Sequence, residues 1–248
     1  MKTSIITITY DKELEYLKYN LKSIQKFCHG YHENIIVIDD HENDCVETQK
    51  YLESIGQKYF VNREAKKIKQ GYIRQQYIKL FSEQYVSSDT DYICHVDTDN
   101  IFTNHHDPSV YFNDGKPILG IQKWSEMPNT IFKPYTDQTM EYESDYNFMR
   151  RMPLVYDFDL FPRLREYIIN LKGELIDYLN TLETISEYNL LGAFAYKFHQ
   201  EKYYWVDTVA QKDLWLKQLK LPCIQYSSRQ KNPRYIDIRK LKDLLKIK

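Results

Sequence analysis

Two features are missing from this sequence: an excess of charge of one sign and a long apolar run. Its 34 Lys and Arg nearly balance its 35 Asp and Glu, giving a formal net charge of −1. Without a global basic field we expect no nucleic-acid partner. No stretch approaches the roughly 20 apolar residues that a transmembrane helix needs. These absences predict a soluble protein, or one that contacts a membrane only at its surface.

Cysteine is scarce, and its few copies form no Cys-x-x-Cys pair. The four cysteines are Cys28, Cys45, Cys94 and Cys223. Such scattered thiols are not a disulfide framework. The apolar stretch at residues 4–10 is followed directly by charge, unlike a secretory leader. We therefore expect reduced cysteines and a cytoplasmic location.

The sequence does have the composition of a globular protein, with 42% apolar and 28% charged residues. Its 248 residues suffice for one substantial core but not for two large ones, so we expect a single domain over residues 1–248. Tyr is abundant, with 23 copies, and such amphipathic rings often line sites for sugars and bases.

Strand and helix patterns alternate through the first hundred residues. Strands are predicted at 4–10, 34–40, 58–61 and 91–97, and helices at 12–27, 46–55 and from residue 71. The unbroken apolar run of the second strand is typical of a parallel sheet buried on both faces. This order predicts an α/β fold, with a mostly parallel open sheet flanked by helices and ligands bound beyond the carboxyl ends of the strands.

The pattern is looser in the second half. Helices are expected near 162–170 and 186–199, strands near 203–206 and 221–226, and a basic helix at 238–248. In the helix that begins near residue 71, Ile73, Tyr77 and Leu80 form an apolar stripe. Arg74, Gln75 and Lys79 are expected to face elsewhere.

The motif Asp97-Thr98-Asp99 follows the fourth predicted strand directly. In an extended segment, residues i and i+2 point to the same side, so both carboxylates can converge on one hard cation, Mn²⁺ or Mg²⁺. The alternative is a solvated turn capped by an Asp side chain.

These elements together resemble the nucleotide-sugar half of a GT-A glycosyltransferase: strand 4–10, the acids ending the second strand, the helix with Arg74, and the strand before Asp97 and Asp99. The segment 70–79 is also similar to a motif of small glycosyltransferase-like proteins from bacteria and large DNA viruses. The resemblance implies a GT-A-like, Rossmann-like domain with residues 1–120 as the nucleotide-sugar-binding half and 121–248 as the acceptor half.

The resemblance also assigns roles to residues. Thr9 and Tyr10 would frame the base, and Asp39 or Asp40 would hydrogen-bond the base or ribose. Asp97 and Asp99 would hold the metal and the ribose, with Asp99 preferred for the direct metal bond. A third protein ligand is not identified.

Arg74 lies in the first turn of its predicted helix, where its guanidinium and the helix amides favour a phosphate or ribose oxygen. The alternative is an ordinary surface Arg. Gln75 is a weaker companion in donor binding.

Glu187 is the candidate catalytic base. The segment 184–192 resembles the acceptor-helix region that often supplies the base in inverting enzymes, and Glu187 would deprotonate an acceptor hydroxyl. The alternative is a Glu favoured by the helix dipole. Tyr188 and Trp124 are either sugar-stacking rings or core residues.

Taken together, the sequence predicts a metal-dependent glycosyltransferase that moves a sugar from a nucleoside-diphosphate donor, uridine-linked by expectation, to a hydroxyl of a glycan or other acceptor. Whether it inverts or retains configuration stays open. The alternatives are a haloacid-dehalogenase-like phosphohydrolase with Asp97 as nucleophile, and a non-catalytic nucleotide-sugar-binding protein. A zinc site at Cys28, His32, His41 and Cys45 is discounted because a strand separates the two pairs. The basic segment 238–248 would touch a membrane surface or dock as a terminal helix.

Overall fold

The central feature of the fold is a five-stranded sheet in the order β3-β2-β1-β4-β9. The computed structural model describes residues 1–40, 45–150, 153–219, 223–225 and 245. The strands are β1 (Thr3–Thr9), β2 (Asn34–Asp39), β3 (Tyr59–Asn62), β4 (Tyr92–His95) and β9 (Leu154–Asp157). The first four run parallel, and β9 is antiparallel to β4.

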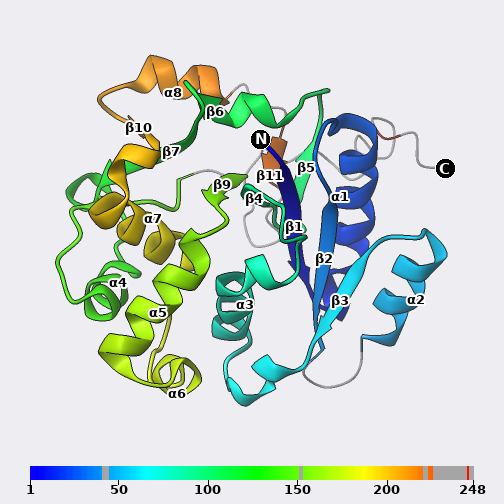
Figure 1. The fold of residues 1–248 in the computed structure, drawn as a ribbon, viewed down its shortest axis with the longest axis horizontal. Coiled ribbons are helices and arrows are strands. Elements are labelled where there is room, and N and C mark those ends of the chain that lie inside the picture. The colour runs from blue at the N-terminus through cyan, green and yellow to red at the C-terminus, as the bar shows by residue number, and fades with distance from the viewer. Residues whose placement is uncertain (41–44, 151–152, 220–222, 226–244, 246–248) are drawn as a thin grey trace.

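Helices cover both faces of this sheet (Figure 1). The connecting helices are α1 (Leu14–Phe27), α2 (Val46–Ser54) and α3 (Gly71–Leu80). Ile36 and Ile38 of β2 share a core cluster with residues of α1 and α2. Ile35 and Val37 share a different cluster with residues of α3. Alternate side chains of β2 are thus buried on opposite faces, as its continuous apolar run predicted.

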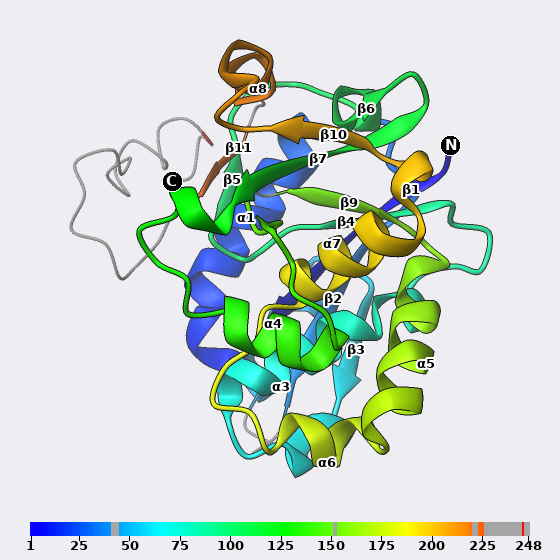
Figure 2. The ribbon, with the colours of Figure 1, turned by 90° about the vertical axis from the view of Figure 1, so that its left-hand side faces the viewer.

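A second group of strands lies beyond β9. In this group β7 (Lys116–Lys123) pairs in parallel with β10 (Tyr204–Asp207) and antiparallel with β6 (Phe112–Asn113) and β8 (Tyr146–Asn147). Separately, β5 (Asn100–Phe102) pairs antiparallel with β11 (Cys223–Gln225). Figure 2 shows β7 and β10 at the top of the molecule, with α4, α5 and α6 gathered below them.

The remaining helices pack mainly around the first sheet and the second group of strands. They are α4 (Lys133–Met140), α5 (Leu160–Lys172), α6 (Leu175–Leu179), α7 (Glu187–Phe198) and α8 (Lys212–Leu219). Short 3₁₀ helices lie at Asp11–Glu13, Glu64–Lys67, Ser82–Gln84, Pro108–Tyr111, Trp124–Glu126 and Gln200–Lys202. Of the helices within the described residues, none has the length and apolar character to cross a bilayer.

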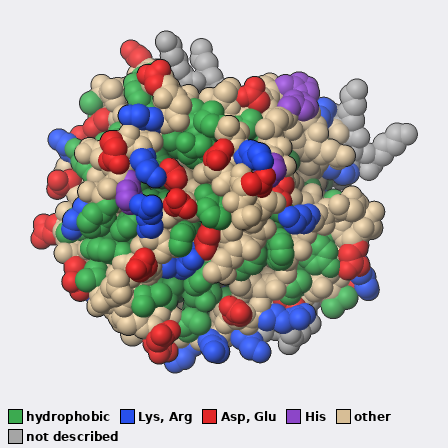
Figure 3. All heavy atoms as spheres, in the orientation of Figure 1, with side chains coloured by type: hydrophobic (Ala, Val, Ile, Leu, Met, Phe, Trp, Pro, Cys, Tyr) green, Lys and Arg blue, Asp and Glu red, His purple; other side chains and the backbone are tan. Residues whose placement is uncertain are grey.

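The observed fold is mixed α/β, with a partly parallel sheet flanked by helices, as the alternating pattern predicted. Strand β9 was not predicted, because four residues that pair only with a distant strand leave little periodic signal. The predicted basic helix at 238–248 lies outside the described residues, Leu245 apart. On the face drawn in Figure 3, acidic and basic side chains are interspersed, in line with the balanced composition.

Candidate functional site

The carboxyl ends of β1, β2 and β4 meet at one edge of the sheet because these neighbouring strands run parallel. Thr9 ends β1 and Asp39 ends β2, while Asp97 follows β4 by two residues. The edge predicted to bind ligand therefore carries the polar side chains that the sequence singled out.

Asp97 is held by one of its two carboxylate oxygens. Lys79 Nζ lies 2.8 Å from Asp97 Oδ1, and the hydroxyl of Tyr188 donates to the same oxygen at 3.3 Å. Among the described residues, no hydrogen bond reaches Oδ2. The side chain of Asp97 is 27% exposed. The carboxylate is thus oriented through one oxygen, and the side chain stays partly open to solvent.

Lys79 joins Asp97 to a second, deeply buried acid. Its Nζ lies 2.8 Å from Oε1 of Glu187 and donates to the Tyr188 hydroxyl at 3.0 Å. The same ammonium stands 4.6 Å from the centroid of the Tyr188 ring, a cation–π contact. Glu187 is only 1% exposed. Asp97, Lys79, Glu187 and Tyr188 form the cluster that we call the Lys79 cluster.

Electrostatics within the Lys79 cluster favour a charged lysine. Burial alone would lower the pKa of Lys79, but the carboxylates of Asp97 and Glu187 outweigh it and raise that pKa. Burial raises the pKa of Glu187, and the ammonium of Lys79 offsets this only in part. Two carboxylates share one cation, so the cluster has an affinity for further positive charge.

Two helices, α3 and α7, bring these side chains together. Gln76 and Lys79 lie within one turn of α3, and the backbone N–H of Glu187 donates to Oε1 of Gln76 at 3.4 Å. Ser186 caps α7 by accepting from the N–H of Asn189 at 3.3 Å. Glu187 therefore sits in the first turn of α7, where the helix dipole favours a carboxylate.

The segment Thr98–Asp99 is a turn, so the prediction of an extended Asp97–Asp99 motif was wrong. Asn100 causes this geometry, because its Oδ1 accepts from the N–H of Asp97 at 3.1 Å. Asn20 of α1 donates to the carbonyls of Asn100 at 2.7 Å and Asp97 at 3.3 Å. The turn is thereby fixed against α1, with Asp99 at its second corner.

Glu13 is a residue of this site that the sequence analysis missed. Its Oε2 accepts a 2.8 Å hydrogen bond from the hydroxyl of Thr98, the central residue of the motif. Burial raises the pKa of Glu13, the bond from Thr98 opposes this, and the charge of Asp97 adds to the rise. The available signal was its place four residues after β1, since that strand ends at the same edge as β4.

The predicted donor-binding residues Asp39 and Arg74 contact each other. Arg74 Nε lies 3.2 and 3.0 Å from the two carboxylate oxygens of Asp39, and Nη1 donates to the carbonyl of Ile68 at 3.2 Å. Both side chains are buried. Arg74 and Lys79 were expected on another face of α3 from the apolar stripe. Both are buried instead, each paired with an acidic side chain.

Each of the other predicted site residues has its own surroundings. Asp40 pairs with Arg63 at 3.1 Å and accepts from the N–H of Cys45. Thr9 is fully buried, Tyr10 is 37% exposed and Gln75 is half-buried. Tyr188 and Trp124 are core residues, 1% and 4% exposed, as the alternative interpretation held.

A metal at this edge would rely on few protein ligands. Within the described residues, no group of three or more His, Cys, Asp or Glu side chains is arranged to hold an ion. Asp97 and Asp99 remain the oxygen donors of the motif. One or two carboxylates with phosphate and water oxygens are a common donor set for Mg²⁺, so the residues present fit such an ion.

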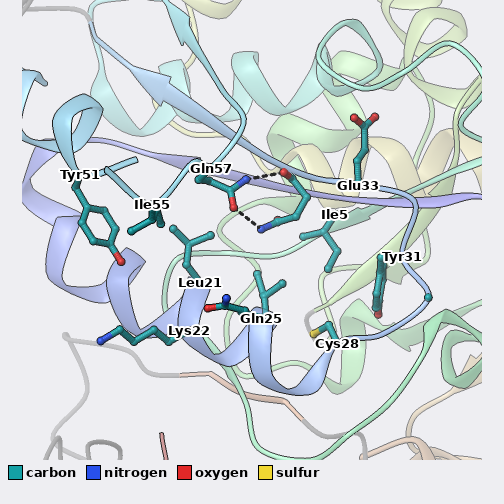
Figure 4. A pocket seen from close by; sticks show the side chains of 13 residues that line it. Ile5, Leu21, Lys22, Gln25, Cys28, Tyr31, Glu33, Tyr51, Ile55 and Gln57 are labelled. Carbon is teal, nitrogen blue, oxygen red and sulfur yellow. Dashed lines mark hydrogen bonds between the residues drawn. The ribbon is translucent and has the colours of Figure 1, made fainter. Parts of the chain in front are cut away.

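A separate pocket of about 480 Å³ lies at the opposite end of the strands (Figure 4). Its wall includes Leu21 and Gln25 of α1 and Cys28 just after that helix, and Gln57 hydrogen-bonds Asn34 at the start of β2. None of the predicted site residues lines it. This pocket is thus distinct from the edge that carries the Lys79 cluster.

A protein-family model matches most of this chain. The model of DUF6492, described as a family of unknown function, matches residues 4–221. A search of the curated proteins finds no match. The matched range contains every site residue described above, from Thr9 to Tyr188.

Proposed function

The chain belongs to the family DUF6492, and we propose that it is a metal-dependent glycosyltransferase with a GT-A-like fold. It moves a sugar from a nucleoside-diphosphate donor, with a uridine donor as first choice, to a hydroxyl of a glycan or other acceptor. The residues before 121 bind the donor, and those after it supply the acceptor side.

One observation carries the proposal: Asp97 is oriented through Oδ1 by Lys79 and Tyr188, and it presents Oδ2 at the carboxyl end of β4. A residue that only stabilised the fold would have no need to keep an oxygen for a ligand. The motif's second acid, Asp99, follows in the same turn. The parallel order β3-β2-β1-β4, with an antiparallel β9 beside it, adds support for a nucleotide-binding sheet.

Asp97 and Asp99 would hold Mn²⁺ or Mg²⁺ together with the diphosphate oxygens of the donor. A bound ion of this kind neutralises the charge that develops on a diphosphate leaving group. Glu13 adds negative charge beside the motif through its bond to Thr98. Lys79 supplies the one cation that contacts Asp97 in the described part of the chain.

The remaining donor contacts follow the order of the strands. Tyr10 lies against the base at the end of β1, with the buried Thr9 supporting it, Asp39 accepts from the base or ribose, and Arg74 holds Asp39 in position. Asp40 and Gln75 are peripheral donor contacts.

Glu187 keeps Lys79 on Asp97, since its carboxylate is paired with that ammonium and is 1% exposed. Its role as the base stays a prediction, and it requires the carboxylate to reach an acceptor hydroxyl. The cytoplasmic location and the contact of residues 238–248 with a membrane surface also stay predictions.

Thermal-shift measurements with uridine diphosphate, with and without Mn²⁺, test the site, because a ligand that binds only the folded state raises the melting temperature. We expect a shift that needs both ligands and is lost in Asp97→Asn and Asp99→Asn. Asp177→Asn, an exposed carboxylate of α6, is the control and should keep the shift. A full metal-dependent shift in both site variants would overturn the site.

Two further measurements separate the alternatives. Slow hydrolysis of a uridine-diphosphate sugar, dependent on Mn²⁺ and on Asp97, would support an enzyme over a silent binding protein. Trapping of a trifluoroberyllate adduct on Asp97 would support the phosphohydrolase instead. Loss of transfer in Glu187→Gln with donor binding intact would support Glu187 as base, and unchanged transfer would exclude it from that role.

A further inference from the structure

An aromatic pair, the exposed Tyr72 and the half-buried Phe132, lies beside the Lys79 cluster. Tyr72 belongs to the first turn of α3, and Phe132 is the residue before α4. Their ring centroids are 6.4 Å apart with an interplanar angle of 22°. Tyr72 is 42% exposed, although large aromatic residues usually bury most of their surface.

The position of Tyr72 in α3 connects this pair to the candidate site. Tyr72, Gln76 and Lys79 are spaced i, i+4 and i+7, so they share one face of the helix. Gln76 contacts the backbone of Glu187, and Lys79 contacts its carboxylate. Burial raises the pKa of the Tyr72 hydroxyl, and the charge of Glu187 adds to the rise. Tyr72 therefore lies on the helix face that carries two residues in contact with Glu187, while much of the residue stays open to solvent.

Apolar side chains extend this surface toward the start of α7. Ile131, next to Phe132, is 53% exposed, and Met149 is 40% exposed. The sulfur of Met149 accepts from the hydroxyl of Ser186, the residue that caps α7, at 3.6 Å. The exposed Met149 thus lies at the end of α7 that carries Glu187, and α4 and α7 both belong to the half predicted to bind the acceptor.

We propose that Tyr72 and Phe132 form an aromatic subsite that stacks on the ring of a neutral pyranose acceptor, an inference that rests on the proposed function. A pyranose has an apolar C–H face and a rim of hydroxyl groups. The aromatic rings match the apolar face. Because the neighbouring cluster has two carboxylates and one ammonium, an anionic sugar is disfavoured there.

Binding of methyl pyranosides, measured by saturation-transfer NMR in the presence of uridine diphosphate and diamagnetic Mg²⁺, tests the subsite. The probes are methyl glucoside, methyl galactoside and methyl mannoside, with methyl glucuronide as the anionic comparison. We expect at least one neutral glycoside to bind, with Tyr72→Ala and Phe132→Ala each weakening it by about tenfold. Tyr72→Phe keeps the ring and should retain binding.

The matched control is Phe60→Ala. Phe60 is 37% exposed on β3 and also belongs to an aromatic pair, with its ring centroid 5.6 Å from that of Tyr85. Glycoside binding should survive this substitution. The melting temperature of each variant shows that it is folded, and the metal-dependent shift with uridine diphosphate should be unchanged in Tyr72→Ala.

The outcomes separate the subsite from the proposed function. Suppose that uridine diphosphate binds with Mn²⁺, but that no methyl pyranoside binds or that glycoside binding is unchanged in Tyr72→Ala and Phe132→Ala. The subsite is then overturned while the donor site stands. If Tyr72→Ala abolishes the nucleotide shift instead, the ring stacks on the donor and the inference is wrong. Tyr72-dependent glycoside binding without any nucleotide shift would support the sugar subsite and remove the transferase proposal.

Discussion

The ammonium group of Lys79 lies 2.8 Å from the carboxylate of Glu187, and both side chains are buried. The same ammonium contacts Asp97 at 2.8 Å. Lys79 thus determines how two acids from different segments are arranged, and it should matter for stability as well as for the site.

Lys79→Met removes the cation while preserving most of the side-chain volume. Breaking a buried ion pair by deleting one partner leaves an uncompensated charge, so we expect the free energy of unfolding to fall by about 3–5 kcal/mol. Urea denaturation followed by circular dichroism measures this change.

The double variant Lys79→Met, Glu187→Gln is the control for that experiment. It removes the deeply buried charge that Lys79 had compensated, and part of the lost stability should return. If the double variant is as unstable as the sum of the two single variants, Lys79 and Glu187 are not coupled.

Arg74→Met should cost more stability than Arg63→Met. Each Arg pairs with an acid at the end of β2, but Arg74 is 8% exposed and Arg63 is 56% exposed as side chains. Asp40 is buried too, but it keeps the hydrogen bond from the N–H of Cys45, and loss of the exposed Arg63 would let water reach it, whereas Asp39 would be left buried without its cation. We expect a loss of about 3–5 kcal/mol for Arg74→Met and of about 1 kcal/mol or less for Arg63→Met. Equal losses in urea denaturation would contradict this explanation.

The first four strands of the sheet could be predicted from the sequence because each is a local apolar run with helix-forming segments between them. The burial of Lys79 could not be predicted from the sequence. Helical periodicity identifies the apolar stripe of Ile73 and Tyr77, but it cannot show that carboxylates distant in sequence will surround a lysine on the same helix.

The shape of the Asp97–Asp99 segment depends on contacts that a motif does not contain. Asn100 and Asn20 fix the turn through hydrogen bonds to Asp97, and Asn20 comes from a helix far earlier in the chain. Glu13 reaches Thr98 for the same reason, since parallel strands bring their ends together. The edge of the sheet at which Asp97 lies was predictable, and the hydrogen-bond partners of the segment were not.

His95 should make the protein less stable as the pH falls below its ordinary pKa of 6.5. Burial, followed by the charge of Lys79, holds the pKa of His95 well below that value in the folded state. Below pH 6.5 the unfolded chain binds a proton that the folded protein excludes, so stability is full above this pH and declines below it. One proton gives a slope of up to about 1.4 kcal/mol per pH unit.

Comparison with His95→Gln isolates this effect, because Gln cannot take up the proton but can still hydrogen-bond Ser82, the partner of His95 Nε2 at 2.7 Å. Between pH 5 and 8, the difference in free energy of unfolding between the two proteins should stay constant above pH 6.5 and change below it, where only the wild type loses stability through this group. Parallel pH profiles would show that His95 does not titrate on unfolding.

Gly192 of α7 permits the close approach of Phe148, and replacing it should displace that ring. A Cβ at position 192 would lie 2.2 Å from Cβ and 2.4 Å from Cγ of Phe148, closer than atoms can pack. Phe148 is 2% exposed, and its backbone N–H donates to Oδ1 of Asn189 in the same helix at 2.8 Å, so it has little room to shift. We expect Gly192→Ala to lower the free energy of unfolding by about 1–3 kcal/mol, despite the better helix propensity of Ala.

Phe148→Leu in the Gly192→Ala background is the control for this prediction. The two substitutions should be less than additive in urea denaturation, because the smaller side chain leaves space for the new methyl group. A stabilising or neutral Gly192→Ala would mean that α7 and the Phe148 segment are not in contact, and the position of Glu187 would then need another support.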